Sequence, residues 1–84
     1  MADNYTALEK YLRDLPADQE EVTMTFDHIE LVLNQMLPLS AHEDGAWWGN
    51  QKPGTQVETI AWMNAGWMVE TFDLKEGWVR FVRQ

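Results

Sequence analysis

The sequence predicts a small α+β domain in which helices pack on a short antiparallel sheet, and three observations favour it. Apolar residues recur at helical spacing in three separate stretches of the chain. An alternating run at Glu21 to Thr25 predicts an early strand. Two further strand-like runs close the sequence and are joined by residues typical of a hairpin turn. The 84 residues have room for one domain, expected to span residues 1–84.

The first helix is predicted from a stripe of apolar residues at i, i+3, i+7 and i+10, namely Tyr5, Leu8, Leu12 and Leu15. Asp3 or Asn4 is expected to cap its start, and Pro16 to end it. In the strand that follows, Val22 and Met24 lie on one face and the threonines on the other.

The second helix is predicted from a stripe that begins directly after the strand, at Phe26, Ile29, Leu33 and Met36. Thr25 is well placed as its N-cap, and Asp27 lies in the first turn, where the helix dipole favours an acid. We expect this helix to end before Pro38. The sequence Ser40-Ala41-His42-Glu43 has the spacing of a capping box, so Ser40 is expected to start a short helical segment that runs from Ala41 toward Trp48.

The third helix is predicted to begin after a Thr55 cap and to end at Gly66 as its C′ residue. Its apolar positions are Val57, Ile60, Ala61 and Met63 or Asn64. Trp67 to Leu74 and Trp78 to Val82 are then predicted as the two strands of a hairpin, with Gly77 free to take a positive φ in the turn.

The order helix, strand, helix, helix, hairpin is that of a winged-helix domain. In that arrangement the early strand pairs with the C-terminal hairpin to give a three-stranded sheet. The pairing matters physically because an isolated hairpin is marginally stable in water. We therefore predict a winged-helix-like fold of three helices and a small antiparallel sheet.

Five segments of the chain carry a family resemblance: Thr25-Phe26-Asp27-His28-Ile29-Glu30, Leu37-Pro38-Leu39-Ser40-Ala41, Trp47-Trp48-Gly49-Asn50, Ala61-Trp62-Met63-Asn64-Ala65-Gly66-Trp67 and Val79-Arg80-Phe81-Val82-Arg83. They resemble a family of small uncharacterised domains found in bacteria and their phages. The double Trp followed by Asn and the Ala-Gly-Trp motif are the most specific parts. The resemblance implies one intact bacterial or phage domain and no catalytic residue, since the family has no assigned activity.

Charge and composition narrow the classes of partner. Fourteen acidic residues face six basic ones, for a net charge of -8, and the acids are spread along the chain. Such a balance disfavours partners rich in phosphate. It fits a solvated surface or an acidic face that competes with nucleic acid for a basic groove. The chain lacks cysteine, a long apolar run and a signal-peptide pattern, so we expect a cytoplasmic protein with no membrane contact.

No catalytic or metal-binding constellation stands out in the sequence. His28 and His42 lack the spacing of a zinc site, and the sole serine, Ser40, is better explained as a cap than as a nucleophile. Gly-rich phosphate-binding loops are absent. We therefore expect no cofactor, no metal and no enzymatic activity.

The tryptophans and several acids are the candidate partner-binding residues. Two adjacent tryptophans can hardly both point inward from a regular element, and Trp on a small domain suits a core or an interface. Trp67 is expected in the core, while the candidates for an interface are Trp47, Trp48, Asn50, Trp62, Trp78, Glu43, Asp44 and Glu58. The third helix, which would read DNA in a winged helix, carries Glu58 and no Lys or Arg.

These observations favour a non-enzymatic, acidic protein-binding module. Its most concrete form is a phage or mobile-element inhibitor of the anti-CRISPR type. It would act in the host cytoplasm on a basic nucleic-acid-binding complex, through steric or charge mimicry of nucleic acid. A winged-helix DNA-binding regulator stays open as an alternative, and a homodimer of it would pool its few cations. So does a structural or interaction domain of another kind.

Overall fold

The computed structural model describes the backbone of residues 5–49 and 57–84, and the side chains of residues 5–49 and 61–84. The elements follow in this order: α1 (Thr6–Arg13), β1 (Glu21–Thr25), α2 (Phe26–Leu33), α3 (Leu39–Glu43), the 3₁₀ helix η1 (Gly45–Trp48), α4 (Val57–Asn64), β2 (Trp67–Asp73) and β3 (Trp78–Arg83). The fold is thus a mixed α and β domain with four α-helices where the sequence predicts three and a short helical segment.

The three strands form one antiparallel sheet in the order β1-β3-β2. The early strand therefore pairs with the C-terminal hairpin, as predicted. Phe81 on the central strand lies opposite Val22 of β1 and Val69 of β2. A register shift between Val69 and Thr71 lets Phe72 return to the inner face beside Val79.

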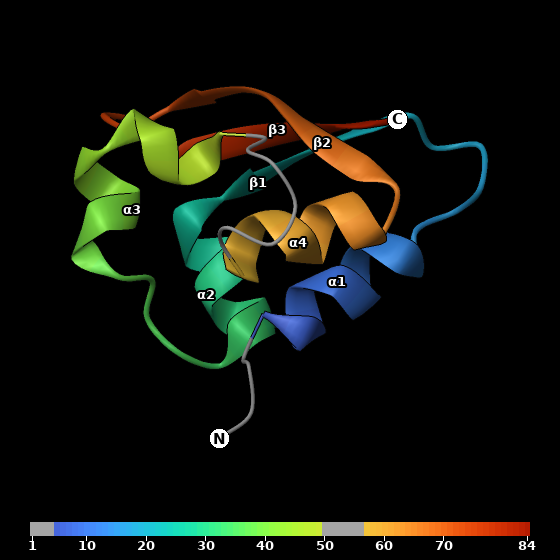
Figure 1. Ribbon diagram of the computed structural model, residues 1–84, viewed down its shortest axis with the longest axis horizontal. Coiled ribbons are helices and arrows are strands. Elements are labelled where there is room, and N and C mark those ends of the chain that lie inside the picture. The colour runs from blue at the N-terminus through green and yellow to red at the C-terminus, as the bar shows by residue number, and fades with distance from the viewer. Residues whose placement is uncertain (1–4, 50–56) are drawn as a thin grey trace.

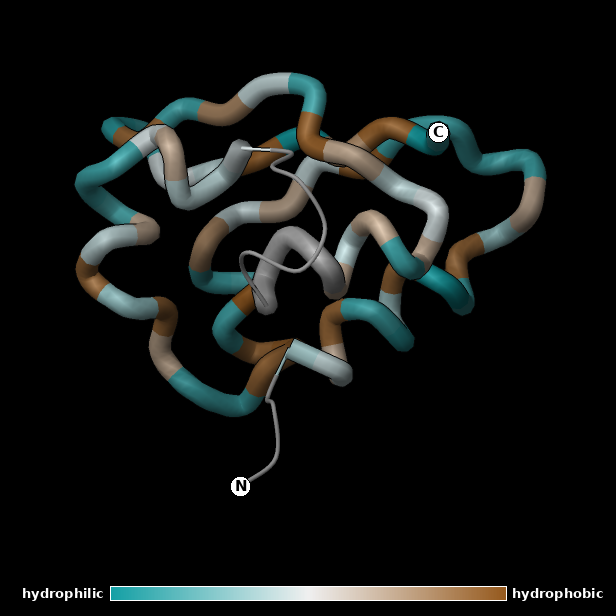
Figure 2. The backbone as a smooth tube through the Cα atoms, in the orientation of Figure 1, coloured by the Kyte–Doolittle hydropathy of each residue, from teal (hydrophilic) through white to brown (hydrophobic). Residues whose placement is uncertain are grey.

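The helices cover one face of this sheet. Figure 1 shows α1, α2 and α4 on the same side of the strands, with α3 at the end of the molecule near the hairpin turn. The buried core between them is formed mainly by large apolar side chains: Leu8, Leu12, Met24, Phe26, Ile29, Leu33, Leu37, Trp48, Trp62, Trp67, Val69, Val79 and Phe81. In Figure 2 the loop between α1 and β1 is mostly hydrophilic, which fits its place outside this core.

The start of α2 follows the prediction and its end does not. The Thr25 Oγ1 accepts a hydrogen bond from the His28 backbone N–H at 3.0 Å, which confirms Thr25 as the N-cap. The helix ends at Leu33, well before Pro38, because Asn34 takes the left-handed conformation at φ 60°. The predicted stripe therefore stops short of Met36, which is 81% exposed.

The segment after Pro38 also differs from the prediction. Ser40 is not a cap: Pro38 holds the N-cap position of α3, and Ser40 lies inside the helix. The predicted continuous segment toward Trp48 is divided at Asp44, whose extended backbone ends α3. The Asp44 carboxylate accepts from the Ala46 N–H at 2.9 Å and so caps η1.

Local backbone features at the other helix ends are partly as expected. Tyr5 is the N-cap of α1 and makes no side-chain capping bond, while Asp3, Asn4 and Thr55 lie outside the described residues. Gly66 and Gly77 have φ values of 89° and 81°, which confirms the predicted C′ glycine and the glycine of the hairpin turn.

Candidate functional site

Two of the tryptophans predicted as partner contacts belong to the core. Trp48 is 1% exposed and Trp62 is 0% exposed. Their rings stack at 5.8 Å between Phe26 on one side and Phe81 on the other. The Trp48 indole N–H is satisfied by the Ala41 carbonyl at 2.8 Å. Both side chains are therefore withdrawn from any partner in this conformation, which corrects the expectation that they form an interface.

The remaining tryptophans divide between the inner and outer surfaces. Trp67 is buried as predicted, and its indole N–H donates to the Leu12 carbonyl at 3.0 Å. Trp47 is half-buried, with its ring 6.1 Å from that of Tyr5. Trp78 is half-buried on the outer sheet face, where the Arg80 guanidinium lies 6.0 Å from its ring centroid.

The structure describes the side chains of only some of the polar residues predicted as partner contacts. Glu43 and Asp44 are exposed at the end of α3, although the Asp44 carboxylate is also the cap of η1. Asn50 lies outside the described residues, as does the side chain of Glu58. Asp44 contacts one of the tryptophans grouped with it, because its backbone carbonyl accepts a hydrogen bond from the Trp47 N–H at 3.0 Å.

Four of the six Lys and Arg residues contact groups of their own chain, while Lys75 lies exposed in the hairpin turn and Lys52 is outside the described residues. Lys10 pairs with Asp14 and Arg13 with Glu9, in each case one helical turn apart. Arg80 lies 3.8 Å from Glu70. Arg83 donates to the carbonyls of Gln19 and Pro16 and covers the Trp67 ring at 4.4 Å.

Neither histidine belongs to a recognisable metal site. Among the described side chains there is no group of three or more His, Cys, Asp or Glu that could hold a metal ion. The His28 ring contacts Tyr11 edge-on at 5.5 Å, and the His42 ring contacts Phe26 at 5.3 Å.

None of the described helices reaches the length and apolar character that crossing a bilayer requires.

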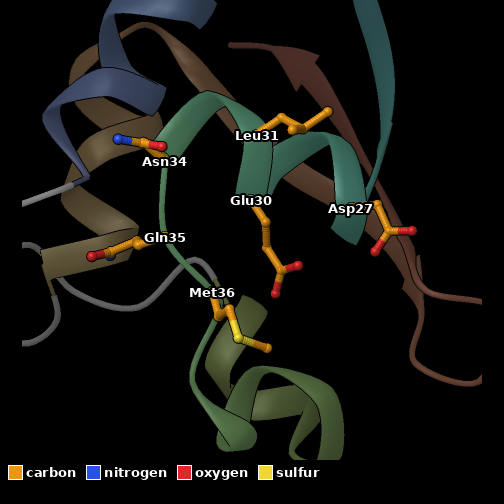
Figure 3. Close-up of a pocket in the computed structure, with 6 residues that line it drawn as sticks. All are labelled: Asp27, Glu30, Leu31, Asn34, Gln35 and Met36. Carbon is orange, nitrogen blue, oxygen red and sulfur yellow. The ribbon is translucent and has the colours of Figure 1, made fainter.

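A groove on the outer side of α2 is the candidate functional site. Its lining residues are Asp27, Glu30, Leu31, Asn34, Gln35 and Met36, and its volume is about 460 Å³. The four from residues 27 to 34 lie at i, i+3, i+4 and i+7, which places them on one face of α2 and its C-cap. Figure 3 shows the Glu30 side chain extending from α2 toward the segment that carries Met36. We call this site the α2–α3 groove.

The α2–α3 groove exposes large apolar side chains that the core does not use. Leu31 is 80% exposed and Met36 is 81% exposed. The opposite face of α2 buries Phe26, Ile29 and Leu33, so Leu31 has no part in holding the helix to the sheet. In Figure 2 the chain between α2 and α3 carries hydrophobic residues along the outer edge of the molecule.

One hydrogen bond, which the Glu30 carboxylate accepts, ties the segment after α2 to this helix. The Glu30 Oε2 accepts from the Leu37 backbone N–H at 2.8 Å, and the His42 Nε2 lies 3.9 Å from the same oxygen. Asn34, in its left-handed conformation, turns the chain so that Gln35 and Met36 come alongside α2. The groove is therefore shaped by the fold before any partner arrives.

A second, smaller depression lies at the other end of α2. It has a volume of about 300 Å³ and is lined mainly by polar groups of α2, α3 and the hairpin turn, including Asp27, His42, Lys75 and Glu76. Asp27 borders both depressions. The smaller depression is of mixed charge, since Lys75 lines it together with the acids Asp27 and Glu76.

Sequence reasoning missed Leu31 and Met36 as site residues. Met36 was counted in the buried stripe of a longer helix. Leu31 was not singled out, although its position, two residues after Ile29 and two before Leu33, places it away from the buried stripe. A large aliphatic residue on the polar face of a predicted helix, with Asp27 and Glu30 beside it, is the signal that could have found the site.

Comparison with known proteins gives one match. A family model described as "Domain of unknown function (DUF7662)" matches residues 5–84. No curated protein and no solved structure matches the chain.

Proposed function

The chain belongs to the family of the domain of unknown function DUF7662, and from that premise we propose that it is a non-enzymatic protein-binding module. Its partner is a basic protein surface of the kind that normally holds nucleic acid. The binding is driven by apolar contact and is guided by negative charge.

The observation that carries this proposal is the pair of exposed apolar side chains in an acidic setting. Leu31 and Met36 are each at least four-fifths exposed, and the acids Asp27 and Glu30 line the same groove. An exposed apolar cluster on a small domain is costly in water and is typical of an interaction site. Charge around such a cluster selects the sign of the partner and speeds its approach.

The charges of the chain support a protein partner over a nucleic acid. The net charge is -8, and Lys10, Arg13, Arg80 and Arg83 already contact groups of their own chain. A DNA-binding protein needs cations that can replace the counterions of the phosphates. Breaking the internal contacts of these residues would cost free energy, and this cost would offset part of the free energy gained on binding DNA.

We further propose that the fold is of the winged-helix type and that an acidic protein of this fold can mimic nucleic acid. The strand order β1-β3-β2 with helices on one face is consistent with that fold. An acidic member of such an architecture is suited to occupy the site that nucleic acid takes on a host complex. In its most specific form, the protein is a phage or mobile-element inhibitor of a nucleic-acid-directed defence complex, of the anti-CRISPR type.

Affinity capture with a nucleic-acid competitor tests this proposal. The tagged chain is mixed with extract of a bacterial host, and the bound proteins are identified with and without added duplex DNA and at rising salt. We expect a basic nucleic-acid-binding protein that is released by DNA and by salt, since the Debye length shortens to about 3 Å at 1 M. A bound partner indifferent to both, or no such partner, would overturn the proposal.

A DNA-binding regulator is the second candidate, and the strand order is the observation that favours it. A gel shift at low salt with random-sequence duplex DNA separates the two. The protein-binding proposal predicts no shift at micromolar protein. A salt-sensitive shift of the duplex would transfer the assignment to the regulator.

A further inference from the structure

We propose that the α2–α3 groove is the docking site for a basic amphipathic helix of the partner, an inference that rests on the proposed function and names its contact. The helix lays an apolar stripe over Leu31 and Met36. Its Lys or Arg residues then face Asp27 and Glu30.

The apolar part of this recognition follows from the exposure of the two side chains. Leu31 and Met36 line one groove and come from segments on either side of the Asn34 turn. Apolar side chains of a docked helix that cover both would remove apolar surface from water. Met adapts its shape to different partners because its side chain is unbranched and polarizable, which suits a docking groove.

The charge of the partner follows from the lining. Among the described residues, the ionisable groups that line the groove are Asp27 and Glu30, and the His42 Nε2 lies 3.9 Å from the Glu30 Oε2. The Glu30 carboxylate is held in place by the Leu37 N–H, so its position is set before docking. An acidic partner segment would bring like charges together at this site, whereas a basic one would be attracted to it.

The helical form of the partner follows from what the groove lacks. An extended peptide gains affinity by pairing with a free strand edge. Within the part of the chain that the structure describes, the groove is lined by α2 and the segment that follows it, without a strand. A helix presents apolar residues at i, i+3, i+4 and i+7 and can lay that stripe into an apolar groove without backbone pairing.

The test uses the full chain, labelled with ¹⁵N, and a peptide probe of defined composition. The probe is a capped peptide of about 18 residues with Leu at i, i+3, i+4 and i+7, about four Lys beside that stripe and Ala, a strong helix former, elsewhere. Two matched peptides serve as controls. One has the same composition in scrambled order, and the other has Glu in place of each Lys.

We expect the Leu/Lys peptide to shift amide signals of α2 and residues 34–37, and the two control peptides to bind at least about tenfold more weakly. Leu31→Ser should raise the Kd of the Leu/Lys peptide by about tenfold or more, as for a central interface residue. Leu39→Ser is the matched control, since Leu39 is 69% exposed and does not line the groove. Its Kd should stay within about twofold.

A second pair of variants tests the charge. Asp27→Asn should weaken the peptide by about three- to tenfold, whereas Glu20→Gln, an exposed change before β1, should have little effect. Equal binding of the scrambled peptide would contradict the proposal. So would amide shifts away from the groove, or equal losses for Leu31→Ser and Leu39→Ser.

Failure of the groove and failure of the proposed function give different results. If a DNA-displaced partner is captured equally well by the wild type and by Leu31→Ser, the groove assignment is wrong and the function stands. If the peptide binds in the groove and no DNA-displaced partner is captured, the proposed function is wrong and the helix-binding site stands.

Discussion

Trp62→Ala is the substitution that most clearly separates a core tryptophan from a partner contact. Trp62 is 0% exposed and lies between Trp48 at 5.8 Å and Phe81 at 5.6 Å. Truncating a buried aromatic side chain costs about 3–5 kcal/mol, because apolar contact is lost and a cavity is left. A chain of this length has a free energy of unfolding on the order of 4–13 kcal/mol. The substitution should therefore remove a large share of the stability, and at the low end unfold the chain.

Urea unfolding followed by far-UV circular dichroism measures this loss. Tryptophan fluorescence is unsuitable because each variant changes the chromophore. Trp62→Phe keeps a ring in the stack and should cost about 1–2 kcal/mol, which leaves a measurable transition if the alanine variant does not fold. Trp78→Ala, on the outer sheet face, is the matched control and should cost about 1 kcal/mol. A Trp62→Ala loss no larger than that of Trp78→Ala would refute the buried stack.

Three further predictions concern the backbone. Gly66 lies at φ 89° with nothing within 4 Å of an added Cβ, so Gly66→Ala should lose about 1–2 kcal/mol through strain alone; an unchanged thermal midpoint would contradict that φ. Thr25→Ala removes the cap on the His28 N–H and should lower the free energy of unfolding by about 1 kcal/mol. Ser40→Ala, inside α3, should change it by less than about 0.5 kcal/mol. Equal losses in urea unfolding would contradict the assignment of Thr25, and not Ser40, as a cap. Asn34→Gly should be nearly neutral and Asn34→Ala should cost about 1 kcal/mol, because Asn34 holds φ 60°; identical urea midpoints would argue against the left-handed turn.

The parts of the fold that the sequence predicts well depend on short-range chemistry. The strand Glu21–Thr25, the Thr25 cap and the positive φ of Gly66 and Gly77 each follow from a few neighbouring residues. The pairing of the early strand with the hairpin was also predicted, from the order of the elements. Local preference and the global fold agree at these places.

The parts that the sequence predicts poorly depend on packing between distant elements. Trp62 follows Ala61 on α4 and lies about 100° around the helix from it, so a narrow apolar stripe drawn through Ala61 leaves Trp62 out. The helix nevertheless buries both residues, since α4 packs against α1 and β2 at once. The end of α2 was misplaced for a different reason. Asn34 can stop a helix or lie within one, and the Glu30 bond to the Leu37 N–H is a contact that no spacing rule predicts.

The sequence predicts an acidic protein-binding surface, but it does not predict where on the molecule that surface lies. The acidic balance and the expectation of a protein partner came from composition, whereas the location came from the structure. The sequence favoured tryptophans because they are frequent at interfaces, but a domain of this size needs large side chains to fill its core. Trp48 and Trp62 serve that need, and the exposed aliphatic residues Leu31 and Met36 are left as the better candidates.

The most direct test of binding through the α2–α3 groove is the recovery of a DNA-displaced partner from host extract by two forms of the chain. One form is the wild type, and the other is the double variant Leu31→Ser/Met36→Ser, which leaves the buried core intact. We predict at least about a tenfold lower recovery with the variant, at unchanged thermal stability. Equal recovery by the two forms would contradict the claim that this acidic domain binds its partner through the α2–α3 groove.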